Sequence, residues 1–238
     1  MKHPRPFQIP DTLYSVLVIG APGAGKGTLA QAIMGEMSRV GSPCSHISTG
    51  DLLRQLPLDD PRAVELQALV AAGKFVSDDT MYELLSERLA EHRHGACLID
   101  GMPRTLPQAQ WMMRAVRPKL AIVLHVPDEV LISRIAGRRT HLPSGRVYNV
   151  NDPNFGPAHA GVDDQTGEPL SVRPEDTSDR ARERLALYAE RTKPVVNYLE
   201  TAFAAEKTPV VLWVDGTRST GEILPTVLPW VAGQLSVH

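Results

Sequence analysis

The feature that most constrains this chain is a glycine-rich loop between an apolar run and a helical pattern. Residues 16–20 form the apolar run, and the loop continues through Gly23 and Gly25 to Lys26 and Thr28. Glycines let a backbone fold around an anion without Cβ clashes, and successive N–H groups at a helix start attract negative charge. Lys26 can reach terminal phosphates, and Thr28 can ligand Mg²⁺. The order of strand, loop and helix therefore predicts a phosphate-binding loop, rather than a turn that only packs a helix on a sheet.

The loop departs from the general pattern at one position, and an amphipathic helix is expected after it. The general pattern places Ser or Thr directly after the Lys, whereas Gly27 comes between them here. The residues expected on the apolar face of the helix are Leu29, Ala32, Ile33, Met37 and Val40.

Composition limits the class of protein. The chain has 238 residues, of which 42% are apolar and 22% charged, as in ordinary globular proteins. The net charge of −2 gives no overall electrostatic case for nucleic acid or a membrane surface. The two cysteines, Cys44 and Cys97, fit a reducing compartment. No apolar run is long enough to span a bilayer. Residues 1–10 lack the apolar segment of a secretory signal. We therefore expect a cytoplasmic monomer without nucleic-acid or membrane partners.

Short apolar runs alternate with helical patterns along the chain. This alternation predicts an α/β fold, with a five-stranded parallel sheet flanked by helices. Ligands of such sheets gather at the carboxyl ends of the strands. The runs expected to form strands are residues 15–20, 45–48, 97–100, 120–126 and 209–214.

Two stretches interrupt this alternation. Residues 140–174 are rich in Gly, Pro, Asp and Asn, and a structureless loop of that length is unusual in a compact domain, so we interpret them as an inserted lid. Residues 49–76 form a second insert of short helices, expected near 52–56 and 63–72. The core is then expected to comprise residues 1–48, 77–139 and 175–238.

Capping patterns indicate two further helices. Thr80 and Glu83 have the spacing of a capping box. Asp128 is expected to cap a helix that carries Arg134 and Arg138 on one face. A guanidinium on that face can stack on an aromatic base or bind a phosphate.

A long helix is expected after Ser178, with a kink at Pro194. Arg180, Arg182 and Arg184 lie on it at a spacing of two, which places neighbours on different faces. The sequence therefore leaves open which of them faces a binding site and which are solvated or neutralised by nearby carboxylates. The residues expected on its buried side are Leu185, Tyr188, Thr192, Val195 and Leu199.

Two further motifs follow expected strands. Residues 48–54 combine a hydroxyl, a glycine, a carboxylate and an arginine, which suits a second phosphate subsite or a helix cap with an exposed Arg. After the third expected strand, Asp100 stands where a carboxylate can orient Mg²⁺-bound water. Arg104 can clamp a phosphate with two donors, and Gln108 shares its helical face if a helix starts near Pro107.

Together these motifs resemble the adenylate kinase family of nucleoside monophosphate kinases, over residues 15 to about 217. The resemblance implies a P-loop core with two mobile inserts, of which residues 49–76 bind AMP and residues 140–174 form a lid over ATP. The segments that carry it are residues 20–28, 48–54, 74–79, 100–104, 137–139, 141–148, 163–170 and 173–184, with Gln108.

The resemblance also implies roles for individual residues. Those implied to bind ATP are Gly23, Ala24, Gly25, Lys26, Gly27, Thr28, Arg134, Arg138, Val147, Tyr148, Gly216, Thr217 and Arg218. Those implied to bind AMP are Thr49, Arg54, Lys74, Phe75, Val76, Gly101, Met102, Pro103, Arg104, Gln108, Arg173 and Arg184. Those implied to act in catalysis are Lys26, Arg104, Arg138, Arg173 and Arg184.

The chain departs from the family pattern in three places, one of which is Asn151-Asp-Pro where the lid usually has Asn-Pro-Pro. Some members hold the lid with four zinc-bound cysteines, whereas the matching positions here are His141, Ser144, Asp163 and Thr166. These side chains can hydrogen-bond one another but make a poor zinc site. Met102 stands where the family usually has Phe, which should change packing and not chemistry.

The function expected from this resemblance is reversible, Mg²⁺-dependent phosphoryl transfer from ATP to AMP, giving two ADP without zinc. A related kinase that uses GTP as donor, or another monophosphate as acceptor, remains an alternative. A P-loop ATPase or switch module is the alternative from a different class. GTP switches usually carry an Asn-Lys-x-Asp motif, which this sequence lacks.

Overall fold

The computed structural model describes residues 13–42, 44–57, 59–74, 76–92, 95–152, 155–205 and 210–235. The expectations for residues 1–12 and the predicted AMP contact of Phe75 lie outside these residues. Among the described residues, no helix combines the length and apolarity needed to cross a membrane.

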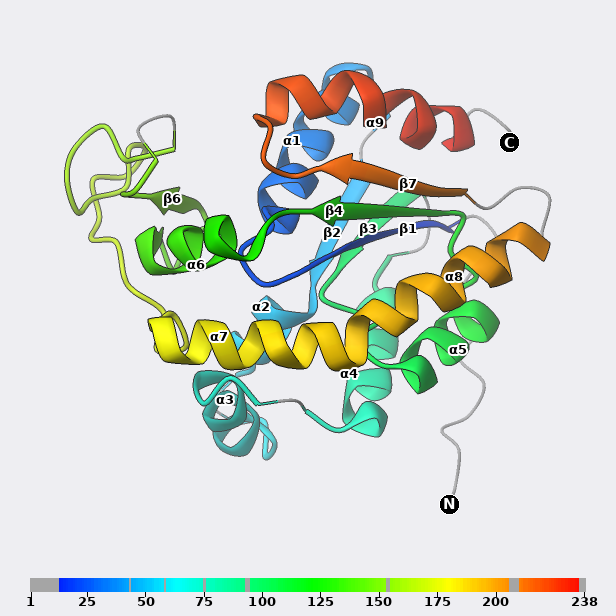
Figure 1. Cartoon of the computed structure of the whole chain (residues 1–238), viewed down its shortest axis with the longest axis horizontal. Coiled ribbons are helices and arrows are strands. Elements are labelled where there is room, and N and C mark those ends of the chain that lie inside the picture. The colour runs from blue at the N-terminus through cyan, green and yellow to red at the C-terminus, as the bar shows by residue number, and fades with distance from the viewer. Residues whose placement is uncertain are drawn as a thin grey trace.

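A five-stranded parallel sheet forms the centre of the molecule, in the order β2-β3-β1-β4-β7 (Figure 1). This confirms the predicted α/β fold. Because β1 is flanked on both sides by other strands and covered on both faces, its continuous apolar sequence is buried throughout. The strands are β1 (Leu13–Gly20), β2 (Cys44–Ser48), β3 (Gly95–Asp100), β4 (Leu120–His125) and β7 (Val210–Asp215).

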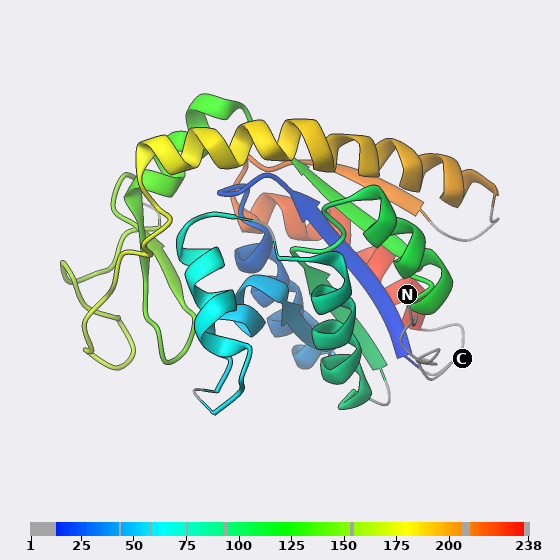
Figure 2. The same ribbon diagram turned by 90° about the horizontal axis from the view of Figure 1, so that it is seen from below.

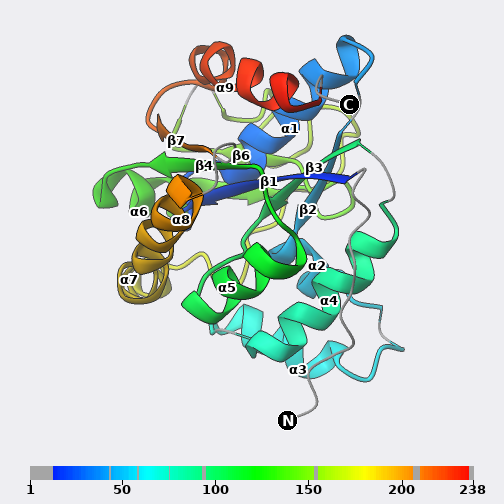
Figure 3. The ribbon, with the colours of Figure 1, turned by 90° about the vertical axis from the view of Figure 1, so that its right-hand side faces the viewer.

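Helices cover both faces of the sheet (Figure 3). On one face, α1 (Lys26–Arg39) and α9 (Thr220–Leu235) pack over Val16, Val18 and Leu98. On the other face lie α4 (Asp78–Ala90), α5 (Leu106–Ala115) and α8 (Lys193–Ala205). The sheet therefore separates two apolar cores, and only its ends are open to ligands.

The buried face of α1 differs in part from the predicted one. Leu29, Ile33 and Met37 are buried as expected, but Ala30 is buried in place of the more exposed Ala32. Val40 was expected on this face and is 67% exposed. Helix α1 ends at Arg39, so Val40 no longer follows the helical periodicity.

Two helix starts differ from the capping patterns. Ser77, not Thr80, caps α4, and its hydroxyl accepts from the backbone N–H of Thr80 at 3.3 Å. Helix α6 (Asp128–Gly137) has Pro127 at its cap position, so Asp128 is already its first helical residue.

Arg134 and Arg138 do not share a helix face. Helix α6 ends at Gly137, and Arg138 begins β5 (Arg138–Thr140) with extended backbone angles. A Cβ at position 137 would lie 2.8 Å from the side-chain carbon of Asn151, so only glycine lets Asn151 pack this closely against the end of the helix. The two arginines therefore reach the same cavity from different elements.

The long helix after Ser178 is interrupted as the proline suggested. It comprises α7 (Ser178–Leu187), the π-helical turn η1 (Tyr188–Thr192) and α8. At this turn the N–H of Lys193 donates to the carbonyl of Tyr188, five residues earlier. Since Pro194 has no N–H, the regular helical pattern could not have continued through it unchanged.

The two expected inserts lie at the carboxyl end of the sheet (Figures 1 and 2). The first contains α2 (Thr49–Arg54) and α3 (Ala63–Ala71). The second begins at the last residue of β5, and its β6 (Val147–Asn149) pairs antiparallel with β5. A bridge between Thr140 and Ser171 extends this pairing. That these segments move as separate domains stays a prediction.

Candidate active site

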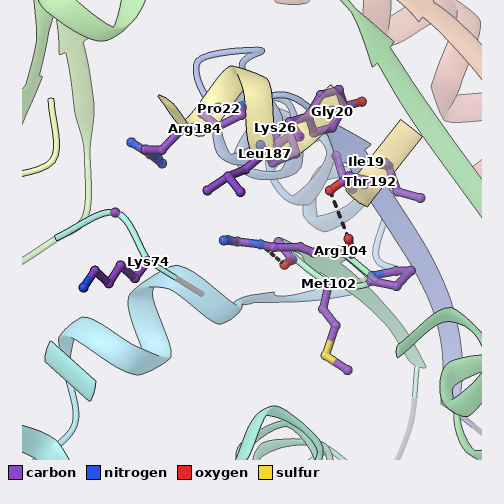
Figure 4. Close-up of a pocket in the computed structure, with 15 residues that line it drawn as sticks. Ile19, Gly20, Pro22, Lys26, Lys74, Met102, Arg104, Arg184, Leu187 and Thr192 are labelled. Carbon is purple, nitrogen blue, oxygen red and sulfur yellow. Dashed lines mark hydrogen bonds between the residues drawn. The ribbon is translucent and has the colours of Figure 1, made fainter. Parts of the chain in front are cut away.

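The loops at the carboxyl end of the sheet enclose a cavity of about 440 Å³. A smaller cavity of about 80 Å³ adjoins it and shares Lys26, Gly101, Arg104 and Arg184 with it (Figure 4). Most of the predicted ATP and AMP residues line one or both cavities. The described exceptions are Thr49, Val76, Gln108 and Thr217.

The glycine-rich loop joins β1 to α1 in a conformation that needs glycine at two positions. Gly23 has φ +83° and Gly25, at the cap of α1, has φ +91°. A Cβ on Gly23 would also lie 2.9 Å from Ile135 Cγ1. Lys26 Nζ donates to the carbonyl of Ala21 at 3.1 Å, which folds the side chain back over the loop.

Positive charge concentrates around Lys26. Burial lowers the pKa of Lys26 to about 8, Asp100 opposes this shift, and Arg104 and Arg184 add to it by repulsion. Burial also lowers the pKa of Arg184 to about 10. Placing several desolvated cations together is unfavourable unless an anion joins them, so the cavity is built to bind one.

The loop after β3, which carries predicted acceptor residues, presents Arg104 to both cavities. Gly101 has φ +87°, and the Arg104 Nε donates to its carbonyl at 2.6 Å. The Arg104 N–H donates to Gln108 Oε1 at 2.7 Å, while Gln108 Nε2 donates to Asp78 Oδ1 at 2.7 Å. Contact of Gln108 with AMP stays a prediction, and it would require one of these bonds to exchange.

The other predicted acceptor residues have mixed surroundings. Lys74 is exposed and its side chain points away from Arg104 (Figure 4). Val76 and Met102 are buried in the core, although Met102 also lines the smaller cavity. Thr49 is 1% exposed, and no hydrogen bond to its hydroxyl is found among the described residues.

Carboxylates hold the arginines at the cavity wall. Asp176 is paired with Arg138 and lies 3.6 Å from Arg184 Nη1. Arg54 pairs with Asp51 at 2.7 Å and with the buried Glu175 at 3.1 Å.

Arg173 joins the same wall, with its Nη2 3.9 Å from Asp51 Oδ1. Burial lowers the pKa of Arg173 to about 10. Of the three arginines on α7, Arg184 alone lines the cavities, while Arg180 binds the carbonyls of Ala71 and Pro174 and Arg182 is exposed.

Arg134, which was predicted to bind the donor, lies beside the turn that follows β7. Arg134 Nη1 donates to the carbonyl of Gly216 at 2.7 Å. A Cβ on Gly216 would lie 2.6 Å from Val126 Cγ2, so glycine permits the turn to lie this close to Val126. Thr217 Oγ1 donates to Asp215 Oδ1 at 2.6 Å, and Thr217 is not among the residues that line the two cavities.

Asp100 provides the position at which a Mg²⁺-bound water would fit. Asp100 Oδ1 is buried, 4.0 Å from Lys26 Nζ, and accepts no hydrogen bond from the described residues. An unsatisfied buried carboxylate oxygen in a phosphate site fits the water shell of Mg²⁺. Thr28 lines the same cavity, so the donor set agrees with the prediction.

His46 is a cavity residue that the sequence reasoning missed. It follows Ser45 in β2, and its Nε2 lies 3.9 Å from Asp100 Oδ2. Burial lowers its pKa, with Asp100 and Asp51 opposing the shift. Residues 45–48 were expected only to form a strand, so nothing in the local sequence marked His46 for the site. The register that sets Ser48 beside Asp100 across β2 and β3 brings it to the site.

The predicted polar cluster holds the segment of residues 140–174. His141 Nδ1 and Ser144 Oγ are 2.6 Å apart, and Thr166 Oγ1 donates to Asp163 Oδ2 at 3.0 Å, which confirms the expected hydrogen bonding. Arg146 adds two bonds to Asp163, at 2.8 and 2.6 Å, and keeps the pKa of that carboxyl well below its usual value. Within the described ranges, no group of three or more His, Cys, Asp or Glu is placed to hold a metal.

A phosphate loop at the carboxyl edge of a parallel sheet, with a lysine and arginines converging on one cavity, defines a P-loop nucleotide-binding protein. The particular family follows from comparison with known proteins. The family model for adenylate kinase matches residues 18–203, so this chain belongs to the adenylate kinase family. It is accordingly a phosphotransferase of the nucleoside monophosphate kinase type.

Proposed function

We propose that this protein catalyses reversible, Mg²⁺-dependent phosphoryl transfer from ATP to AMP, giving two molecules of ADP. The observation that carries the proposal is the convergence of Lys26, Arg104 and Arg184 where the two cavities meet. A nucleotide switch or simple ATPase needs one nucleotide site and gains nothing from a second arginine-lined pocket.

In this proposal the reaction depends on positioning and charge neutralisation. An ionised oxygen of the AMP phosphate attacks the γ-phosphorus of ATP as the bond to the β,γ-bridging oxygen breaks, leaving ADP on each side. No general base is needed because the attacking oxygen already carries its charge. Lys26, Arg138, Arg173 and Arg184 neutralise the transferred group, and Arg104 holds the acceptor phosphate.

Asp176 would keep two of these arginines in place before nucleotide arrives. It pairs with Arg138 and lies near Arg184, so both guanidinium groups already face the cavity. Phosphate oxygens would then add to, or replace, the carboxylate contacts. This arrangement reduces the entropy lost when the charged side chains are fixed around the transferred group.

Thr28 and Asp100 would hold Mg²⁺, directly and through water respectively. When bound, the ion shields the phosphate charges and helps to align the phosphoryl group for transfer.

We further propose that residues 49–76 and 140–174 close over AMP and ATP, and that residues 1–48, 77–139 and 175–238 form the core. Closure would exclude water, which otherwise competes as acceptor. Ion pairs between Arg173 and Asp51, and between Arg54 and Glu175, support a closed arrangement because they join the two inserts and the segment just before α7.

The free cysteines Cys44 and Cys97 are consistent with the cytoplasm.

The test is a coupled assay of ADP formation from ATP, AMP and Mg²⁺, run beside ATP alone. We expect ADP only when AMP is present. ADP with free phosphate from ATP alone would indicate an ATPase. Initial rates measured under the same conditions with GTP in place of ATP, and with CMP or UMP in place of AMP, identify the bases that the two sites accept. Faster transfer from GTP, or to a monophosphate other than AMP, would contradict the proposed substrates.

A further inference from the structure

A π-turn interrupts the long helix beside the smaller cavity (Figure 4). Tyr188 and Thr192, at its two ends, both line this cavity together with Arg104. Such turns are uncommon and occur frequently at functional sites. Pro194 explains why the helix is disturbed near this point, but not why Thr192 faces the loop after β3 that carries Arg104.

Thr192 uses its hydroxyl differently from another threonine of the same helix. A helical threonine commonly donates to the carbonyl four residues earlier, as Thr201 does to Asn197 at 3.0 Å. For Thr192 that carbonyl would be the carbonyl of Tyr188, at the other end of the π-helical turn. Thr192 Oγ1 instead donates to the backbone carbonyl of Arg104 at 3.1 Å (Figure 4).

The Arg104 backbone is thereby held from two sides. Its N–H donates to Gln108, which Asp78 anchors, and its carbonyl accepts from Thr192. Thr192 is 4% exposed and Gln108 is 2% exposed, so water does not readily replace either bond. Since the Arg104 Nε is also bonded to the Gly101 carbonyl, the direction of the guanidinium depends on where this short loop lies.

We propose that Thr192 is a positioning residue for phosphoryl transfer: through the Arg104 carbonyl, it aims the Arg104 guanidinium at the acceptor phosphate. The inference rests on the proposed function, because it takes Arg104 to be an acceptor-site residue. A guanidinium binds phosphate with two donors in a fixed geometry, so a small displacement of the loop weakens the acceptor site. The donor site, built on the loop after β1, should be unaffected.

The experiment compares Thr192→Val, which removes the hydroxyl and keeps the shape, with Thr192→Ser, which keeps the hydroxyl. Thr201→Val is the matched control in the same helix. Thr192→Val is also combined with Arg104→Ala. Initial rates are measured against AMP and against ATP, and thermal unfolding is recorded for every variant.

We expect Thr192→Val to lower kcat/KM for AMP about tenfold, with KM for ATP changed less than about twofold. Thr192→Ser should recover most of the loss, and Thr201→Val should behave as wild type. When Arg104 is already alanine, adding Thr192→Val should lower kcat/KM for AMP by less than about twofold, because no guanidinium remains to be positioned. If Thr192→Val does not fold, Thr192→Ala compared with Thr192→Ser provides the same comparison.

The inference is overturned if removal of the hydroxyl leaves kcat/KM for AMP unchanged, or if the loss falls equally on ATP and AMP. It is also overturned if the losses from Thr192→Val and Arg104→Ala multiply independently. Wild-type transfer to a different monophosphate contradicts the proposed function alone, and the same variants are then compared with that acceptor. A wild-type protein without any transfer activity overturns both proposals.

Discussion

Substitution of Gly101 by alanine tests how closely the loop after β3, which carries Gly101 and Arg104, packs against its neighbours. Gly101 has φ +87°, a conformation that L-residues rarely adopt. An added Cβ would lie closer than 3.0 Å to Thr49 Oγ1 and 3.1 Å from Arg104 Nη2. The substitution therefore combines backbone strain with a steric clash against two predicted AMP residues.

The two costs can be estimated separately. Left-handed backbone costs an L-residue about 1–2 kcal/mol, and overpacking of a filled site costs about 1–3 kcal/mol more. We expect Gly101→Ala to lower the free energy of unfolding by about 2–5 kcal/mol. Relief of the clash should displace Thr49 or Arg104 and raise KM for AMP, while KM for ATP stays near the wild-type value.

Gly41→Ala is the matched control for backbone strain. Gly41 has φ +74°, but a Cβ there would have no neighbour within 4 Å. Urea unfolding of both variants, with initial rates against AMP and ATP, separates the two costs: Gly41→Ala should lose about 1–2 kcal/mol and no activity. The reasoning is refuted if both variants are equally stable, or if Gly101→Ala leaves KM for AMP unchanged.

The further predictions concern the charged residues of the cavity, the segment of residues 140–174 and the absence of a structural metal. Lys26→Met should lower kcat by about 10²–10³-fold or more. It should not lower stability, because it removes a cation that is desolvated and repelled by its neighbours. Near-normal turnover would contradict the assignment of Lys26 to phosphoryl transfer. In the wild type, nucleotide affinity should weaken as pH rises through about 8, the lowered pKa of Lys26. Unfolding stability without nucleotide should rise between that pH and the ordinary lysine pKa, because only the unfolded lysine still binds a proton there. Both trends should vanish in Lys26→Met, as titration calorimetry and urea unfolding at several pH values can check. Arg104→Ala should lower kcat/KM for AMP by about 10²–10³-fold, measured by initial rates, and unchanged AMP kinetics would misplace the acceptor site. Asp163→Asn, which weakens the bonds to Arg146 and Tyr148, should increase protease cleavage within residues 140–174 and raise KM for ATP. Treatment with EDTA should leave melting unchanged, and a lowered melting temperature would indicate a structural metal.

The elements of the core could be read from the sequence because their signals are local. The apolar run before Gly23 and the helix after Lys26 follow from residue type and spacing alone, and the five strands lie within two residues of the expected positions. Apart from the exchange of Ala32 for Ala30 on the buried face of α1, the errors in the helices lay at their ends. Ser77 caps α4 in place of Thr80, and Arg138 leaves α6 for a strand, because neighbouring segments and not the local pattern decide where a helix stops.

The contacts between distant segments could not be read in this way. Nothing in the sequence near Thr192 indicates that its hydroxyl reaches Arg104, 88 residues earlier. His46 read as a strand residue until the register of β2 and β3 brought it beside Asp100. Only the fold distinguished Arg184, which faces the cavity, from Arg180 and Arg182.

By itself, then, the sequence identified which chemical groups gather at the cavity: a glycine loop with a lysine, arginines and one carboxylate at the ends of parallel strands. Strand periodicity and glycine conformation act over a few residues, so they are legible along the chain. The tertiary structure decided which arginines share a cavity, which carboxylates hold them and how the Arg104 loop is anchored. Those outcomes depend on strand register and on where each helix ends, and both arise from packing between segments that lie far apart in the chain.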